Sequence, residues 1–136
     1  MAEVAAASSL FLERGYEATS IDELVAATRL HRGSLYKAFG SKRGIFLAAL
    51  RRLVHDELPL AVAGPDDPAN AGILDLLLVA ALELAPRDQE VRDLLERACL
   101  LLAQRATGAE PEEPSTLLGR RLLARADVRI TQPCPG

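Results

Sequence analysis

Apolar residues recur every three or four positions through most of the chain, which is the spacing of one face of an α-helix. In the first such stretch, residues 2–14, one face holds Val4, Ala7, Leu10 and Phe11, and Gly15 follows as a typical helix end. Runs of β-branched residues, which would favour strands, are absent. The same spacing predicts further helices at about residues 20–28, 32–39, 42–57, 68–85, 88–106 and 115–127.

Residues that cap helices stand where several of these stretches begin. Ser20 followed by Glu23 is a capping-box pattern, and Ser41 stands just before the fourth stretch. We expect Asp67 to be the N-cap of the fifth helix, ahead of a proline that suits the first helical position. Ser115 is expected to cap the last helix.

Composition supports an all-α fold, since 49 % of the residues are apolar, only 4 % are aromatic, and Leu and Ala dominate. We expect two parts, a helical head at residues 1–56 and a helical body at 57–136. A Pro- and Gly-containing linker at 63–68 separates them, and a tail at about 130–136 is expected to be disordered.

Two short helices joined by the tight turn Thr28-Arg29-Leu30 form a helix-turn-helix motif at about residues 20–39. Such a turn favours Gly at its left-handed position, where we expect Arg29 at a cost of about 1 kcal/mol. In the second helix Leu35 and Phe39, four residues apart, face inward. Its outward residues are Arg32, Ser34 and Lys37, with Gly33 leaving a flat spot.

Charge is divided unevenly along the chain, although the net charge is only −3. Residues 1–28 carry −4, residues 29–52 carry +7 without a single acid, and residues 53–136 carry −6. A basic segment between two acidic ones indicates a local anion-binding surface. Lys42 and Arg43 fall in the first turn of a helix, where its dipole disfavours cations unless a phosphate docks there.

Other functional classes find no support in the sequence. Cys99 and Cys134 fit no metal-site spacing, so we expect no metal or cofactor. No Gly-rich phosphate loop occurs and the two His lie far apart, so we expect no enzyme. A secretory signal is not evident and the longest apolar run, 76–82, is too short to span a membrane, which predicts a cytoplasmic protein.

Residues 5–50 resemble the DNA-binding head of the TetR family of bacterial transcriptional repressors. The residues that carry the resemblance are Leu10-Phe11, Gly15-Tyr16, Thr19-Ser20-Ile21, Leu24-Val25-Ala26, Gly33-Ser34-Leu35-Tyr36 and Phe39-Gly40-Ser41-Lys42. The stretch 83–91 also resembles the early body helices of one branch of that family.

The resemblance implies that the helix at 32–39 enters the major groove of double-stranded DNA. By chemistry, Arg32 and Lys37 suit guanine edges, whereas Ser20, Tyr36 and Lys42 suit phosphates. The DNA-binding residues that it implies are Thr19, Ser20, His31, Arg32, Gly33, Ser34, Tyr36, Lys37 and Lys42.

The resemblance also implies a homodimeric repressor that a small apolar effector releases from its operator. Family dimers pair through two long helices, which residues 107–136 do not resemble, so we expect a short member with a truncated body. The alternative is a truncated helical interaction module that pairs with another regulator and does not bind DNA.

Several residues have a second interpretation from the sequence alone. The basic run is also compatible with a solvated helix face, and His31 with a weak N-cap. Tyr36 is compatible with a core aromatic whose hydroxyl reaches the edge, and Cys99 with ordinary core packing.

Overall fold

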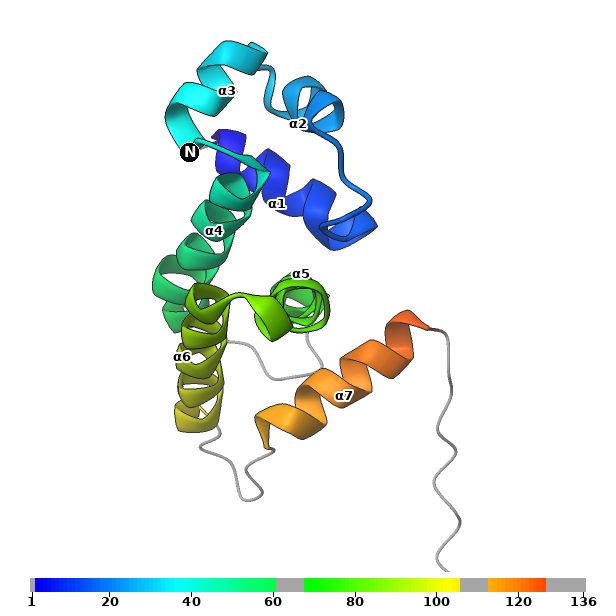
Figure 1. Ribbon diagram of the computed structural model, residues 1–136. Helices are drawn as coiled ribbons and strands as arrows, with labels where there is room; N and C mark the ends of the chain where they lie inside the picture. Colours follow the sequence, from blue (N-terminus) through cyan, green and yellow to red (C-terminus); the bar gives the residue numbers. More distant parts are fainter. Residues whose placement is uncertain (1, 61–67, 106–112, 127–136) are drawn as a thin grey trace, which may run out of the picture.

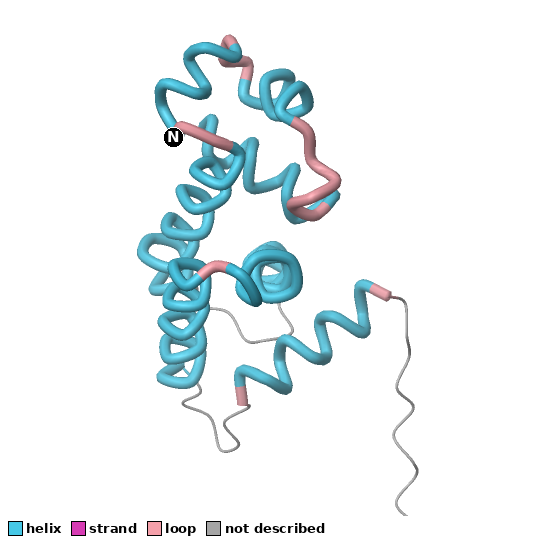
Figure 2. The backbone as a smooth tube through the Cα atoms, in the orientation of Figure 1, coloured by secondary structure: helices cyan, strands magenta, loops and turns pink. Residues whose placement is uncertain are grey.

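The structure is a computed structural model that describes residues 2–60, 68–105 and 113–126. Within these ranges every regular element is helical, which confirms the predicted all-α fold (Figures 1 and 2). Short π-helical (η1, η3) and 3₁₀ (η2, η4) segments follow α4 and α5. The elements are α1 (Ala2–Arg14), α2 (Ile21–Thr28), α3 (Arg32–Phe39), α4 (Lys42–Arg52), η1 (Leu53–Glu57), η2 (Leu58–Leu60), α5 (Pro68–Val79), η3 (Ala80–Leu84), η4 (Ala85–Arg87), α6 (Gln89–Arg105) and α7 (Pro114–Arg125).

The helix-turn-helix, α2 and α3, lies at one end of the molecule, away from α5, α6 and α7 (Figure 1). α1 and α3 have the bounds that the sequence predicted. The Ser20 hydroxyl accepts a hydrogen bond from the Glu23 N–H at 3.1 Å, which confirms Ser20 as the N-cap of α2. The second half of the capping box is replaced, because the Glu23 carboxylate pairs with Arg14 at 3.0 Å.

The turn between α2 and α3 has the predicted left-handed residue. Arg29 has φ of 62°, and its N–H donates to the Val25 carbonyl at 3.0 Å. The Thr28 hydroxyl donates to the Leu24 carbonyl at 2.7 Å and is itself buried. These bonds fix the angle at which α3 leaves α2.

An aromatic cluster forms the centre of the head. Phe11 of α1 and Phe46 of α4 are fully buried, with ring centroids 5.1 Å apart in an edge-to-face arrangement. The Tyr16 ring completes the cluster at 5.9 Å from Phe11 and 5.4 Å from Phe46. Such geometry stabilises aromatic pairs beyond their burial. Tyr16 therefore folds back onto the α1 core.

α4 and η1 form one continuous helix that joins the head to the body. Every member of its apolar stripe is buried. The members are Ile45, Phe46, Ala49, Leu50 and Leu53. The predicted boundary between the two parts, at residues 56 and 57, falls inside η1, and α6 lies beside α4 (Figure 1). The predicted boundary thus falls within a continuous helix.

The predicted helix at 68–85 changes geometry before its end. α5 stops at Val79, η3 follows as a π-helix, and η4 is a 3₁₀ segment that contains Pro86. Because proline has no N–H to donate, a regular α-helix cannot run through it. The predicted N-cap Asp67 lies outside the described residues.

The start of α7 differs from the prediction. Ser115 is not its N-cap, because α7 begins at Pro114 with Glu113 in the capping position. Proline suits the first helical position, where no hydrogen bond is lost. Most of the predicted linker at 63–68 and the whole predicted tail at 130–136 lie outside the described residues.

No helix among residues 2–60, 68–105 and 113–126 is long and apolar enough to cross a membrane.

Candidate nucleic-acid interface

α3 exposes nearly all of its residues to solvent. Leu35 is its one fully buried residue, and Phe39 packs half-buried against the same core. The predicted inward pair is therefore correct. The exposed predicted site residues on or next to α3 are His31, Arg32, Gly33, Ser34, Tyr36 and Lys37.

The exposed face of α3 is shaped for a close approach by another surface. A Cβ on Gly33 would meet nothing within 4 Å, so its backbone lies open. Tyr36 is 42 % exposed, which places its ring on the surface and not in the core. His31 precedes the helix with an extended backbone, and its side chain makes no capping bond. The first N–H groups of α3 therefore lack a side-chain cap.

The cations of the helix-turn-helix differ in whether an acidic side chain pairs with them. Arg32 forms an ion pair with Asp22 of α2, whose side chain is 81 % exposed. Among the described residues, Lys37 and Arg29 make no ion pair. Lys37 and Arg29 are thus available to pair with an external anion.

Thr19 is placed differently from the surface position that the resemblance implied. It is 1 % exposed, and its hydroxyl donates to the Gly15 carbonyl at 2.7 Å. Its side chain therefore supports the turn before α2 and cannot reach a ligand in this conformation. Ser20 is exposed, and its hydroxyl oxygen caps α2 while its proton stays available to a phosphate.

Lys42 is held by the head itself. Its Nζ donates to the carbonyls of Tyr16 and Thr19, at 3.1 and 3.3 Å, and lies 4.4 Å from the centre of the Tyr16 ring. Carbonyl acceptors and an aromatic face both stabilise an ammonium group. This cation near the start of α4 thus has acceptors within the fold.

The remaining cations of the basic segment do not extend the α3 surface. Arg43 makes a two-point pair with Asp88, at 2.6 and 3.0 Å, and Arg51 pairs with Glu90. Arg52 lies 3.5 Å from Glu57. Acids pair with these three arginines, so the anion-binding surface indicated by the sequence does not include the whole +7 segment.

The Arg43–Asp88 pair also changes the titration of both groups. The hydrogen bonds from Arg43 hold the pKa of the Asp88 carboxyl below its usual value, and the same bonds raise the pKa of Arg43. Asp88 also accepts from the N–H groups of Glu90 and Val91, at 3.1 and 3.3 Å. It is therefore both the N-cap of α6 and a link between body and head.

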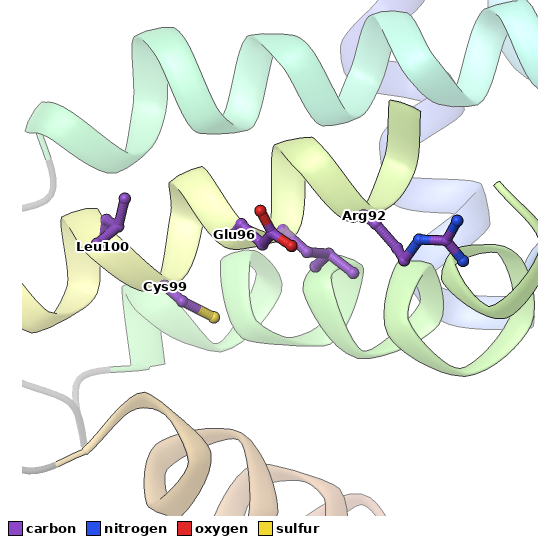
Figure 3. A pocket seen from close by; sticks show the side chains of 5 residues that line it. Arg92, Glu96, Cys99 and Leu100 are labelled. Carbon is purple, nitrogen blue, oxygen red and sulfur yellow. The ribbon is translucent and has the colours of Figure 1, made fainter. Parts of the chain in front are cut away.

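A hollow of about 560 Å³ lies along α6 (Figure 3). Cys99 is half-buried in its wall, and burial, followed by the charge of Glu96, raises the pKa of its thiol. A raised pKa makes a thiol less reactive. Its described lining residues are Arg92, Leu95, Glu96, Cys99 and Leu100.

No group of His, Cys, Asp or Glu in the described part of the chain could hold a metal ion.

Comparison with known proteins identifies the head. A family model described as "Bacterial regulatory proteins, tetR family" matches residues 4–49, which cover α1 to α3 and most of α4. The chain belongs to the tetR family. Curated relatives that match the chain are named as transcriptional repressors.

The curated relatives are longer than this tetR-family chain. The transcriptional repressor BepR of Brucella suis biovar 1 (strain 1330) is 32 % identical over 106 residues, 74 % of this chain and 51 % of BepR. The repressor BdcR of Escherichia coli (strain K12) is 36 % identical over 80 residues, 57 % of this chain and 41 % of BdcR. The chain thus spans about half or less of the length of the relatives it matches.

A solved structure of another TetR family regulator aligns with 96 % of this chain. It is the crystal structure of the TetR family transcriptional regulator PfmR from Thermus thermophilus, at 25 % identity and a TM-score of 0.45. The alignment covers 75 % of that chain.

Sequence reasoning did not predict the contacts between body acids and the head. Glu83, Asp88 and Glu90 all lie in the stretch 83–91 that resembled family body helices. That resemblance was the available signal, but it gave no pairing with the head.

Proposed function

We propose that the chain is a DNA-binding transcriptional regulator whose helix α3 enters the major groove of double-stranded DNA. The observation that supports this most directly is the outer face of α3. It is exposed, carries no acid, and presents Lys37 without an ion-pair partner among the described residues. A helix of this kind, held by few buried residues, can approach base edges closely.

Each predicted site residue has a proposed role in that complex. Arg32 and Lys37 reach base edges, with Arg32 exchanging Asp22 for guanine. His31 and Ser34 contact bases or phosphates at the start of α3, and Gly33 lets the backbone come close. Ser20 and Tyr36 donate hydroxyl protons to phosphates. Lys42 contacts phosphate only by leaving its carbonyl acceptors, and Thr19 acts through the turn.

The experiment is a salt titration of binding to a duplex that the wild-type chain selects from a random-sequence pool. We expect binding at low salt with a negative slope of log K against log salt. Because Lys37 is proposed to reach a base edge, Lys37→Ala should weaken binding by about 1–3 kcal/mol with little effect on the slope.

Arg97→Ala, which removes an exposed cation of α6, is the matched control and should leave both quantities unchanged. Absence of binding at low salt would contradict the proposal and favour the interaction-module alternative. Equal effects of the two variants would also contradict it.

We further propose that the chain is a homodimeric cytoplasmic repressor controlled by a small apolar effector. The curated relatives BepR and BdcR are named as repressors. The hollow along α6, with Leu95 and Leu100 in its wall, has the size of a small-molecule site. Two heads must lie about 34 Å apart to enter successive grooves, so pairing matters for affinity. Sedimentation of a clean monomer at micromolar concentration would contradict the dimer.

A further inference from the structure

A carboxylate of the body holds the turn that leads into the helix-turn-helix. Glu83, in η3, accepts a hydrogen bond from the Tyr16 N–H at 2.8 Å with one oxygen. Its other oxygen accepts from the Glu17 N–H at 3.0 Å. Neighbouring N–H groups that both donate to one carboxylate form a strong, charge-assisted contact. Without Glu83, these two donors would need another acceptor or water.

The turn is built to receive this carboxylate. Gly15 has φ of 86°, and a Cβ at that position would lie 2.8 Å from the Glu83 oxygen. Glycine suits this φ, and a Cβ here would displace the Glu83 carboxylate. On its other side, the turn's carbonyls at Tyr16 and Thr19 accept from Lys42. Glu83 and Lys42 thus hold the donors and acceptors of the same turn.

The π-helical geometry of η3 accompanies this placement. Glu83 is half-buried against the head, whereas its neighbour Leu82 is 61 % exposed. A single π-helical turn changes the direction in which successive side chains leave the helix and is frequent at functional sites. The exposure of a leucine beside an inward-facing glutamate reverses the order expected from burial alone.

Two further pairs connect the same part of the body to the head. Asp88 pairs with Arg43 in the first turn of α4, and Glu90 pairs with Arg51 further along the same helix. Glu83 differs from both because it binds backbone groups, whose positions set the direction of the chain entering α2. A shift of η3 would therefore reach the helix-turn-helix through the turn as well as through α4.

We propose that Glu83 is a positioning residue of the DNA-binding head: its carboxylate fixes the α1–α2 turn and so the orientation of α2 and α3 on DNA. This inference rests on the proposed DNA-binding function. Glu83 touches neither base nor phosphate and acts through the N–H groups of Tyr16 and Glu17.

The experiment compares Glu83→Gln with the wild-type chain by amide hydrogen exchange and by affinity for the selected duplex. Glutamine keeps the size of the side chain but offers only one acceptor oxygen, so one amide loses its bond. Exchange at Tyr16 or Glu17 should become about tenfold faster, as expected for loss of a charge-assisted bond. The Leu35 amide, which donates to the His31 carbonyl within α3, should keep its rate. DNA affinity should fall about fivefold.

Asp93→Asn is the matched control, since it removes one exposed body carboxylate whose partner, Gln89, lies on the same helix. Its DNA affinity should stay within twofold of wild type. Unchanged exchange at both turn amides would overturn the contact, and equal affinities for the two variants would overturn the positioning role. If the wild-type chain selects no duplex, the proposed function fails, while the exchange result still decides whether Glu83 holds the turn.

Discussion

At Arg29 a side chain occupies a backbone conformation that normally belongs to glycine. Its φ of 62° brings the Cβ close to the following carbonyl, which costs about 1 kcal/mol or slightly more. The sequence predicted this strain from position alone, because a turn of this length needs one left-handed residue. Arg29 is exposed and, within the described ranges, has no ion-pair partner that would compensate.

Replacement of Arg29 by glycine should therefore stabilise the chain. We expect Arg29→Gly to raise the free energy of unfolding by about 1 kcal/mol, measured by urea denaturation. Arg29→Ala is the control, because it removes the charge but keeps the Cβ and hence the strain. Equal stability of the two variants would show that the arginine charge, and not the backbone, determines the change.

The contacts of Thr19 and Lys42 could not be predicted from the sequence. Both were assigned to DNA through resemblance, since nothing local indicated another partner. In the structure, Lys42 reaches backbone carbonyls 26 and 23 residues earlier in the chain. Because every residue has a backbone carbonyl, the sequence does not indicate which carbonyls will accept a bond, and only the three-dimensional fold shows it.

At the scale of the helices, caps and apolar spacing predicted most bounds. Ser20 caps α2 by accepting a hydrogen bond from the Glu23 N–H at 3.1 Å. Ser41 caps α4 in the same way, accepting from the Gly44 N–H at 3.0 Å. The π-helical ends of α4 and α5 were not predicted, because π-helix and α-helix share nearly the same apolar spacing. The partners that hold α7 were also missed, since they lie 46 residues apart.

Asp75 of α5 and Arg121 of α7 form the tie between these two helices. Asp75 is only 7 % exposed and accepts two bonds from Arg121, at 2.7 and 2.9 Å. We expect Asp75→Asn to lower the free energy of unfolding by about 2 kcal/mol. The loss is smaller than for a fully buried pair, because the Arg121 side chain is 30 % exposed to solvent.

Asp93→Asn, at an exposed position whose partner is Gln89 of the same helix, should change stability by less than about 0.5 kcal/mol. A double variant of Asp75→Asn with Arg121→Gln should lose less than the sum of the two single variants. Additive losses in urea denaturation would show that the two side chains do not act as a pair.

Across the whole molecule, acids of the body pair with basic residues of the head, beside an apolar core that both parts share. The sequence showed a basic segment between acidic ones, which indicated a local anion-binding surface. The structure divides that segment, with Arg43 and Arg51 paired internally to Asp88 and Glu90, and with Lys37 facing outward. Net charge by segment could not show this, because pairing depends on how α6 lies beside α4.

The Arg43–Asp88 pair should give the head–body contact a pH dependence. The pKa of Asp88 is lowered in the folded chain, so its contribution is present above its unfolded pKa of about 3.9 and is lost as pH falls through the lower folded value. The difference in Tm between wild type and Asp88→Asn should therefore be constant from about pH 5 to 7 and shrink below about pH 4.

Asparagine keeps an oxygen that can cap α6, so this variant removes the charge with little change to the helix start. Asp93→Asn, which likewise removes one body charge, controls for the change in net charge. A difference in Tm that grows on acidification would contradict the assigned sign.

The internal pairing of the α4 cations has a consequence for how such a regulator would search a chromosome. Under the proposed function, few cations per head remain to displace counterions from arbitrary sequences, so attachment to random DNA should be weak. A protein that is seldom sequestered on the genome's many competing sites needs a smaller preference for its operator to occupy it. The body acids that bind Arg43 and Arg51 would thereby shorten unproductive residence and leave recognition to α3.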